Sequence, residues 1–361
     1  MSKNHTIDLV KFFAIVSVVC IHAGPFYTVN LFGLNGSYIS NIIIAIARVG
    51  VPIFFAISGY LFTLKVNKNP EAEEYFLKYI KKTLKLFLTW YLFYLLYDII
   101  LIAVGSKSNI WNYIEEVKNY LGNLPIIEVI LYGQTGNSSY QLWYLIALIW
   151  AIVILFVGLK YGIFKYLFIL SFILNIIGLF GQGYSGIYEL TFNTREALFF
   201  GMFYVNLGAL SALNSNRIAA LTRKLTLNKT LILITLFCLL QALERFATIV
   251  LWNPNSSDYF ISTIPATLLI MVLIVKFPNL SKYKWLNKIG NKSVGIYVTH
   301  VLFVELVNNF ISSAVQSNMV FNLIIVPVIL ILSYHLYLLL VTINNKINFT
   351  VKTRLVDQYV R

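Results

Sequence analysis

Long apolar runs, separated by short polar stretches, cover almost the whole chain. About 20 consecutive apolar residues are needed for a helix to cross the hydrocarbon core of a bilayer. By that measure the pattern predicts about ten membrane-spanning helices. The predicted spans are 7–28, 41–64, 84–104, 141–158, 164–181, 195–213, 229–251, 259–276, 293–313 and 321–343. We therefore expect an all-α, polytopic integral membrane protein.

The composition supports this fold class. The chain of 361 residues is 59% hydrophobic and 12% charged, with a mean hydropathy of +0.77. Soluble domains average roughly 45–50% apolar and about 25% charged residues, so this chain needs the bilayer as solvent. The longest polar gaps, 65–85 and 105–140, are too short for a second soluble domain. We expect a single transmembrane domain over 1–361.

The distribution of basic residues predicts the orientation. With the N-terminus in the cytoplasm and alternating spans, all but five of the 28 lysines and arginines fall on the cytoplasmic side. The exceptions are Arg48, Lys107, Lys118, Arg195 and Arg245. The same count places both termini in the cytoplasm. The net charge of +14 is then a topology signal, and we expect no nucleic-acid partner.

Ionisable residues are numerous inside the predicted spans. Each costs about 2.5–3.5 kcal/mol on insertion scales, so such residues usually face a partner or a polar cavity. The residues are His22, Arg48, Asp98, Arg195, Glu244, Arg245, His300, Glu305 and His335. Each one alone has an ordinary structural explanation. Together they predict a polar cavity within the helix bundle.

The first span carries three ionisable side chains in its segment "DLVKFFAIVSVVCIH". Asp8 and Lys11 are three residues apart, and Lys11 and His22 are eleven apart, so all three share one helical face. Lys11 and His22 are separated by roughly 16 Å along the axis at 1.5 Å per residue. One stripe thus connects a cytoplasmic cation to a deep imidazole. A snorkelling Lys11 and a His22 bonded to a neighbouring helix remain an alternative.

Five sequence motifs in order resemble one family. The first is Lys11–x10–His22 preceded by Asp8, where the family usually has arginine in place of lysine. The others are "GVPIFFAISGYLF" (50–62) with Ser58 and Gly59, "KKTLK" (81–85) with Lys82 and Lys85, "SSYQLWYL" (138–145) with Trp143, and "IGNKSVGIYVTH" (289–300) with Gly290, Ser293, Tyr297 and His300. Over about 5–345 the chain resembles the membrane-bound acyltransferase-3 family.

The resemblance implies an enzyme of the bacterial plasma membrane. It implies transfer of an acyl group, most often acetyl, from cytoplasmic acetyl-CoA to a hydroxyl of a cell-surface or capsular polysaccharide or its lipid-linked precursor. Lysine at positions 11, 82 and 85 keeps the charge of the family's arginine but loses its bidentate fork. We also expect no appended extracellular esterase-like domain, so that the membrane domain or a separate protein would complete the transfer.

The resemblance also suggests roles for individual residues. His22 is the expected general base or transient acyl carrier, because imidazole titrates near neutral pH and suits both tasks. Lys11, with Asp8 as its partner, would hold the donor end of the channel. The expected donor contacts are Lys82, Lys85, Tyr297, His300 and Ser293. Positive-inside bias alone would also explain the sign of Lys82 and Lys85.

An acceptor-side vestibule is expected on the outer half. Its candidate residues are Arg48, Trp143, Arg195 and Glu244, together with Asp98 and Glu305. Trp143 could equally be an interfacial aromatic residue. Cys20 and Cys238 lie in apolar runs and are expected to be small hydrophobes, and we expect no metal.

Other functions remain open at this point. A transporter or flippase for a lipid-linked glycan would also need polar groups at mid-membrane. A glycan polymerase would favour a large, charged outer loop. Within the family, succinyl or another acyl group could replace acetyl. The acceptor sugar and the oligomeric state are left undetermined.

Overall fold

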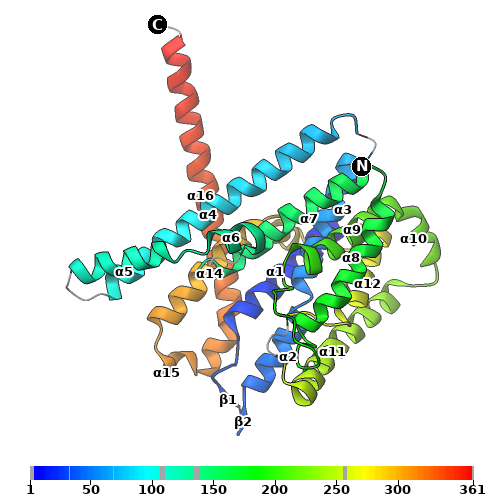
Figure 1. The fold of residues 1–361 in the computed structure, drawn as a ribbon, viewed down its shortest axis with the longest axis horizontal. Coiled ribbons are helices and arrows are strands. Elements are labelled where there is room, and N and C mark those ends of the chain that lie inside the picture. Colours follow the sequence, from blue (N-terminus) through cyan, green and yellow to red (C-terminus); the bar gives the residue numbers. More distant parts are fainter. Residues whose placement is uncertain are drawn as a thin grey trace.

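The computed structural model describes residues 4–31, 33–67, 69–105, 110–133, 138–254 and 258–359. Within these ranges the chain is a helical bundle with one short antiparallel pair, β1 (Asn30–Leu31) and β2 (Leu34–Asn35) (Figure 1). The helices are α1 (His5–Ala23), α2 (Ser37–Ala47), α3 (Gly50–Val66), α4 (Ala72–Gly105), α5 (Ile110–Gly122), α6 (Ile126–Tyr132), α7 (Trp143–Lys160), α8 (Phe164–Gly178), α9 (Met202–Leu213), α10 (Ser215–Leu221), α11 (Leu227–Trp252), α12 (Thr263–Lys276), α13 (Lys284–Asn291), α14 (Ser293–Phe310), α15 (Ser313–Gln316) and α16 (Met319–Tyr359). Short turns of other helix types are η1 (Tyr140–Leu142), η2 (Leu179–Gly181) and the π-helix η3 (Ala197–Gly201).

Every predicted span overlaps a helix, but not all of them are long, straight crossings. In the described part of the chain, 8 helical segments are long and apolar enough to span a membrane. The bent segment Ala197–Leu213 with Ser215–Leu221, which turns by 84°, makes this up to 9. The predicted span 259–276 corresponds to α12, which has 14 residues. The structure therefore supports a multi-pass membrane protein, and the predicted number of crossings stays a prediction.

The first helix is shorter than the predicted span 7–28. It begins after Asn4, whose side chain accepts a hydrogen bond from the backbone N–H of Ile7 at 3.2 Å. It ends at Ala23, because Gly24 adopts a left-handed conformation with φ +52° and closes the helix. His22 consequently lies in the last turn of α1, beside irregular backbone.

Helices α3 and α9 form the tightly packed centre of the bundle. Gly59 on α3 lies against the backbone of Val205 on α9, and Gly208 on α9 lies against the backbone of Ala56. A Cβ atom at either glycine would collide with main-chain atoms, so both positions require the absence of a side chain. Such close approach through small residues is typical of helix pairs in membranes.

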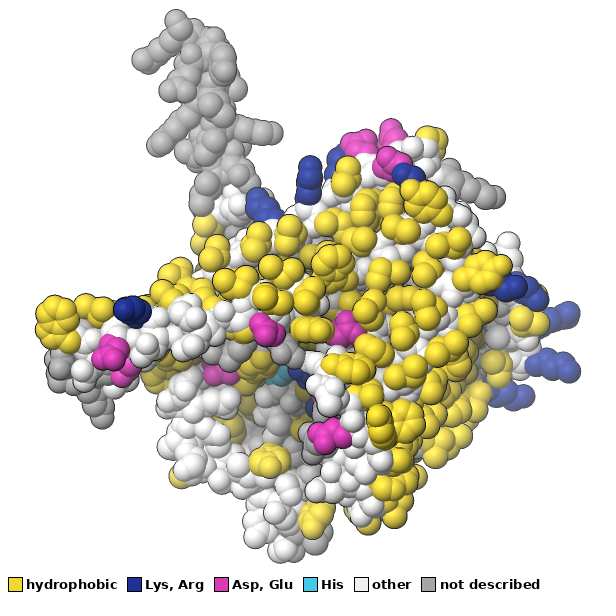
Figure 2. Space-filling view, in the orientation of Figure 1, with side chains coloured by type: hydrophobic (Ala, Val, Ile, Leu, Met, Phe, Trp, Pro, Cys, Tyr) yellow, Lys and Arg dark blue, Asp and Glu magenta, His cyan; other side chains and the backbone are white. Residues whose placement is uncertain are grey.

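The surface has the character of a membrane protein. Figure 2 shows apolar side chains over a broad face, with lysines and arginines gathered toward its borders. Large apolar residues that are strongly exposed include Leu88 and Leu92 on α4 and Phe246 and Val250 on α11. Lys107, one of the predicted exceptions to the charge rule, lies outside the described residues. The sides of the membrane on which the termini lie stay a prediction.

Candidate active site

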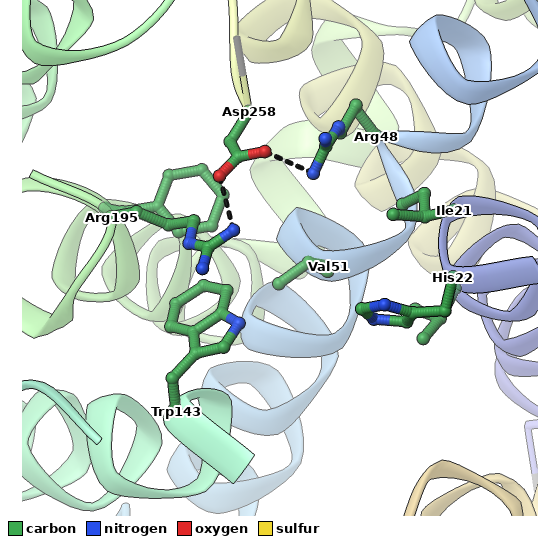
Figure 3. A pocket seen from close by; sticks show the side chains of 9 residues that line it. Ile21, His22, Arg48, Val51, Trp143, Arg195 and Asp258 are labelled. Carbon is green, nitrogen blue, oxygen red and sulfur yellow. Dashed lines mark hydrogen bonds and ion pairs between the residues drawn. The ribbon is translucent and has the colours of Figure 1, made fainter. Parts of the chain in front are cut away.

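A small pocket lies where several helices begin, end or break. It has a volume of about 40 Å³. Its lining residues are Val18, Ile21, His22, Arg48, Val51, Trp143, Arg195, Phe200 and Asp258 (Figure 3). The lining residues come from segments that are far apart in the sequence, between Val18 and Asp258. The pocket therefore forms only in the folded bundle.

The polar lining residues sit at interruptions of helical structure. His22 is in the last turn of α1, and Arg48 is the residue that ends α2 just before α3 begins. Arg195 precedes the π-helix η3, and Asp258 lies in the connection between α11 and α12. Irregular backbone at membrane depth is tolerated where it lines a cavity or is buried in protein. The helix breaks are therefore what allow these polar groups to converge.

Asp258 joins the two arginines of the pocket. One carboxylate oxygen pairs with Nη1 of Arg48 and the other with Nη1 of Arg195 (Figure 3). Its backbone N–H also donates to the side chain of Gln182 at 3.2 Å. Burial by itself would raise the pKa of Asp258, but the charges of Arg48 and Arg195 outweigh it and hold the pKa below its ordinary value. Asp258 is therefore ionised at neutral pH.

Trp143 forms a wall of the pocket. The guanidinium carbon of Arg195 lies 5.0 Å from the centre of the Trp143 ring, which is a cation–π distance. Only 9% of Trp143 is exposed, so the ring is part of the bundle interior and is not an interfacial aromatic residue. Arg195 is thus held from two sides, by the ring and by Asp258, and its orientation is well defined.

His22 stands opposite these arginines and is backed by a second histidine. The ring centres of His22 and His300 are 5.2 Å apart, and those of His22 and Tyr140 are also 5.2 Å apart. Within the described residues His22 has no side-chain hydrogen bond. His300 is fully buried, and its Nδ1 lies 2.7 Å from the carbonyl oxygen of Tyr297, so this nitrogen carries a proton. Its Nε2 has no hydrogen-bond partner.

Two of the expected donor residues, Tyr297 and Ser293, are placed around His300. The hydroxyl of Tyr297 donates to the carbonyl oxygen of Gln141, which ties α14 to η1. Ser293 is buried at the start of α14, about two turns before His300. The structure thus brings His300 to His22, with Tyr297 on the other side of His300, whereas the sequence had separated His22 from a donor pocket.

Asp8 and Lys11 lie away from the pocket on the same helix as His22. Asp8 is buried, and its backbone packs against Gly290 of α13, where a Cβ would collide. Lys82 and Lys85 are exposed on α4 and do not line the pocket. Roles for these four residues in donor binding stay predictions, and they concern a region distinct from the His22 pocket.

Glu244 supports the pocket from behind and does not line it. Its carboxylate accepts hydrogen bonds from the Tyr184 hydroxyl at 2.6 Å and from the backbone N–H groups of Ile261 and Ser262 at 2.7 and 2.9 Å. These bonds hold the segment that follows Asp258. Asp98 is likewise absent from the pocket lining and is bonded by Ser138 and Tyr120. Of the ionisable residues expected in the vestibule, Arg48 and Arg195 line this pocket.

Asp258 is the functional residue that sequence reasoning missed. It stands one residue before the predicted span 259–276, in a polar connection where an acidic residue is unremarkable. The available signal was indirect, since Arg48 and Arg195 were grouped on the outer side with acidic residues of the spans, and the acidic residues of the connections were not considered. A search for a counter-ion in the outer connections would have included Asp258.

Among the residues that the structure describes, no group of three or more histidine, cysteine, aspartate or glutamate side chains could hold a metal ion. Cys20 and Cys238 are free thiols and are partly buried.

Comparison with known proteins identifies the family. The sequence profile of the acyltransferase-3 family, described as an acyltransferase domain, matches residues 4–338. The chain belongs to this family. Its relatives include an amino-acid racemase of Enterococcus faecalis, 31% identical over 234 residues, which cover 60% of this chain and 30% of the relative. A serine/alanine racemase of Enterococcus gallinarum is 29% identical over 224 residues, which cover 58% of this chain and 29% of the relative.

A longer alignment is found with a second amino-acid racemase of Enterococcus faecalis. It is 24% identical over 330 residues, which cover 85% of this acyltransferase-3 chain and 42% of the relative. The chain thus spans less than half the length of the relatives that it matches. No solved structure matches the chain.

Proposed function

We propose that this membrane acyltransferase is an O-acetyltransferase. It transfers acetyl from cytoplasmic acetyl-CoA to a hydroxyl of a cell-surface or capsular polysaccharide or its lipid-linked precursor in the bacterial plasma membrane. The observation that carries the proposal is the position of His22. Its imidazole faces a polar pocket, has no hydrogen bond within the described chain, and is backed by His300. A histidine in this position is available to take a proton from an incoming hydroxyl.

The proposed reaction is a direct acyl transfer. The acceptor hydroxyl gives its proton to His22 as its oxygen attacks the thioester carbonyl of the donor. A C–O bond forms, the C–S bond breaks, and His22 returns the proton to the departing thiolate of coenzyme A. In the variant with a covalent step, a nitrogen of His22 attacks the thioester carbonyl, the C–S bond breaks, and the thiolate of coenzyme A takes the proton that the acetylated imidazolium gives up. The acceptor hydroxyl then attacks the acetyl-imidazole, the C–N bond breaks, and the hydroxyl proton returns to the imidazole.

His300 has a positioning role in this scheme. Its Nδ1–H is directed at the Tyr297 carbonyl, which leaves Nε2 unprotonated and without a partner in the described chain. The fixed ring of His300 packs beside His22 and limits the orientations of the catalytic imidazole. Trp143 and Arg195 close the opposite wall.

The donor is proposed to enter from the end of α1 that carries Asp8 and Lys11. Lys11 lies roughly 16 Å from His22 along the helix axis, so phosphates near Lys11 and a thioester near His22 require an extended donor. Lys82 and Lys85 would add point charges for phosphate at the same membrane surface. With the N-terminus in the cytoplasm, all three lysines face the compartment that holds acetyl-CoA.

The names of the relatives widen the range of acceptors to be tested. Because one of them is named a serine/alanine racemase, serine, which carries a hydroxyl, is included as a small acceptor beside glycans. Transport of such a molecule, or of a lipid-linked glycan, is the competing function. It also needs a polar pocket within the bundle, but it requires no transfer of label from acetyl-CoA.

The decisive experiment follows labelled acetyl in oriented membrane vesicles. Wild-type protein and the His22→Ala variant are supplied with acetyl-labelled acetyl-CoA on one face, and label is followed into protein, lipid-linked glycan, polysaccharide and amino acids. We expect transfer by the wild type only, and only with donor on the cytoplasmic face. His335→Ala is the matched control, since His335 is exposed on α16 and does not line the pocket.

Two outcomes contradict the proposal. Undiminished transfer by a correctly inserted His22→Ala variant removes His22 from the centre of the reaction. Absence of transfer by every variant, with lipid-linked glycan or amino acid still crossing the membrane, assigns the protein to transport.

A further inference from the structure

Asp258 has more positively charged partners than its single carboxylate can neutralise. Arg48 and Arg195 share its single carboxylate, and Arg245 lies close enough for its charge to act on the same group. No second carboxylate pairs with these arginines among the residues that the structure describes. The cluster of Arg48, Arg195, Arg245 and Asp258 therefore has a surplus of two positive charges inside the protein.

Several hydrogen-bond donors of this cluster are unused. Each guanidinium offers five N–H donors. Among the residues that the structure describes, Arg245 makes one bond, to the side-chain oxygen of Asn41 at 3.2 Å, and its Nε and Nη1 are buried without a partner. Within the same residues, Nε of Arg48 is also buried without a partner. Buried cations that lack partners are strongly unfavourable, so the arrangement indicates an anion that arrives from outside the chain.

The lining of the pocket suits an anionic oxygen group. Arg195 is oriented by Trp143 and Asp258, and Arg48 is held by the other oxygen of Asp258. Oriented guanidinium groups bind carboxylate and phosphate through paired hydrogen bonds. The volume of about 40 Å³ accommodates a group of that size.

We propose that this pocket binds an acidic group of the acceptor, a carboxylate or a phosphate, between Arg48 and Arg195. The bound group places a neighbouring hydroxyl of the same molecule at His22, which lines the same pocket. Arg245 does not line the pocket and strengthens binding through its charge. The acceptor is therefore an acidic molecule, such as a uronic acid or a phosphate-bearing unit.

The phosphates of acetyl-CoA do not suit the position between Arg48 and Arg195. In acetyl-CoA the phosphates are separated from the thioester by a long flexible arm. A thioester that reacts at His22 leaves those phosphates well away from the arginines beside it. That the cluster binds an anion follows from its surplus charge alone. That this anion belongs to the acceptor, and that the acceptor's hydroxyl faces His22, rests on the proposed function.

The test measures thermal unfolding of the purified full-length protein with paired small probes at equal ionic strength. Galacturonate is compared with galactose, and glycerol 3-phosphate with glycerol. We expect a saturable rise in melting temperature with the acidic member of at least one pair and none with its neutral partner. The pair that responds distinguishes carboxylate from phosphate.

Variants locate the binding. Arg245→Gln removes a charge without removing a residue that lines the pocket. We expect it to weaken binding of the acidic probe roughly five- to tenfold. Lys82→Gln with Lys85→Gln is expected to leave the response unchanged. His22→Ala should keep the response while losing acyl transfer, so failure of the proposed reaction and failure of the anion site are distinguishable.

The inference is overturned if the wild type responds equally to acidic and neutral members of both pairs, which needs no variant. An equal response in Arg245→Gln and in the wild type overturns it as well. Adenosine 3′,5′-bisphosphate, a fragment of the donor, serves as the last probe. If it competes with the acidic sugar or glycerol phosphate for this site, the site belongs to the donor and the assignment to the acceptor is wrong.

Discussion

His22 and His300 lie with their ring centres 5.2 Å apart and their planes tilted by 46°, although helices α2 to α13 lie between α1 and α14 along the chain. Of the two histidines, His22 lines the pocket and His300 is fully buried behind it. This arrangement separates a reacting imidazole from a supporting one. The consequences of that separation, and of the ion pairs opposite, can be measured.

Replacement of His300 should reduce turnover more than donor binding. We expect His300→Ala to lower kcat by about 10²-fold, because His22 loses the ring that limits its orientation. KM for acetyl-CoA should change little. His300→Asn, which retains a polar side chain able to bond the Tyr297 carbonyl, should recover part of the lost kcat. Steady-state kinetics in vesicles checks this, and an equal rise of KM with an unchanged kcat would instead place His300 in donor binding.

The ion pairs of Asp258 should stabilise the protein in a pH-dependent way. Its pKa is lowered in the folded state, so its contribution is present above the pKa of the unfolded chain and is lost as pH falls through the folded value. The difference in melting temperature between wild type and Asp258→Asn should therefore be largest near neutral pH and should shrink toward acidic pH. Melting curves recorded from about pH 3 to pH 7 test the sign. A difference that grows on acidification would show the opposite linkage.

Close packing between α3 and α9 should be sensitive to a single methyl group. Gly59→Ala puts a Cβ against the backbone of Val205, which cannot move as a flexible side chain would. We expect a loss of about 1–3 kcal/mol in stability from this overpacking. Gly105→Ala is the control, since nothing lies within 4 Å of its Cβ position. Unfolding measured by a detergent titration should leave the control near the wild type, and equal behaviour of both variants would exclude tight packing at Gly59.

Glu244 should influence the pocket through the segment that it anchors. Glu244→Gln keeps the size of the side chain but weakens the acceptance of two backbone N–H bonds, at Ile261 and Ser262. We expect a lower melting temperature and roughly tenfold weaker acceptor use, because Asp258 lies just before that segment. Tyr184→Phe removes one of the same carboxylate's partners and should have a smaller effect. If acceptor use is retained by Glu244→Gln at normal stability, Asp258 is positioned by other contacts.

The sequence by itself determined the membrane class and the family. Apolar runs and the bias of basic residues reflect the insertion of each segment into lipid. They are local features, so they can be recognised in the sequence without knowledge of the tertiary structure. The motif Lys11–x10–His22 and the later stretches ending at His300 identified the family that the profile over residues 4–338 confirms. The number of crossings stays a prediction, because local reasoning cannot distinguish a long straight helix from the bent helices after Ala197 or from the short α12.

The composition of the pocket was decided only by tertiary structure. Arg48 and Asp258 are far apart in the sequence, and Asp258 stands in a polar connection with no pattern of its own. The sequence predicted that Glu244 lines the acceptor side. In the structure its carboxylate instead accepts hydrogen bonds from Ile261 and Ser262 behind the pocket. Which charges meet depends on where helices break and how α1, α3, α7 and α14 pack, and these are properties of the whole bundle.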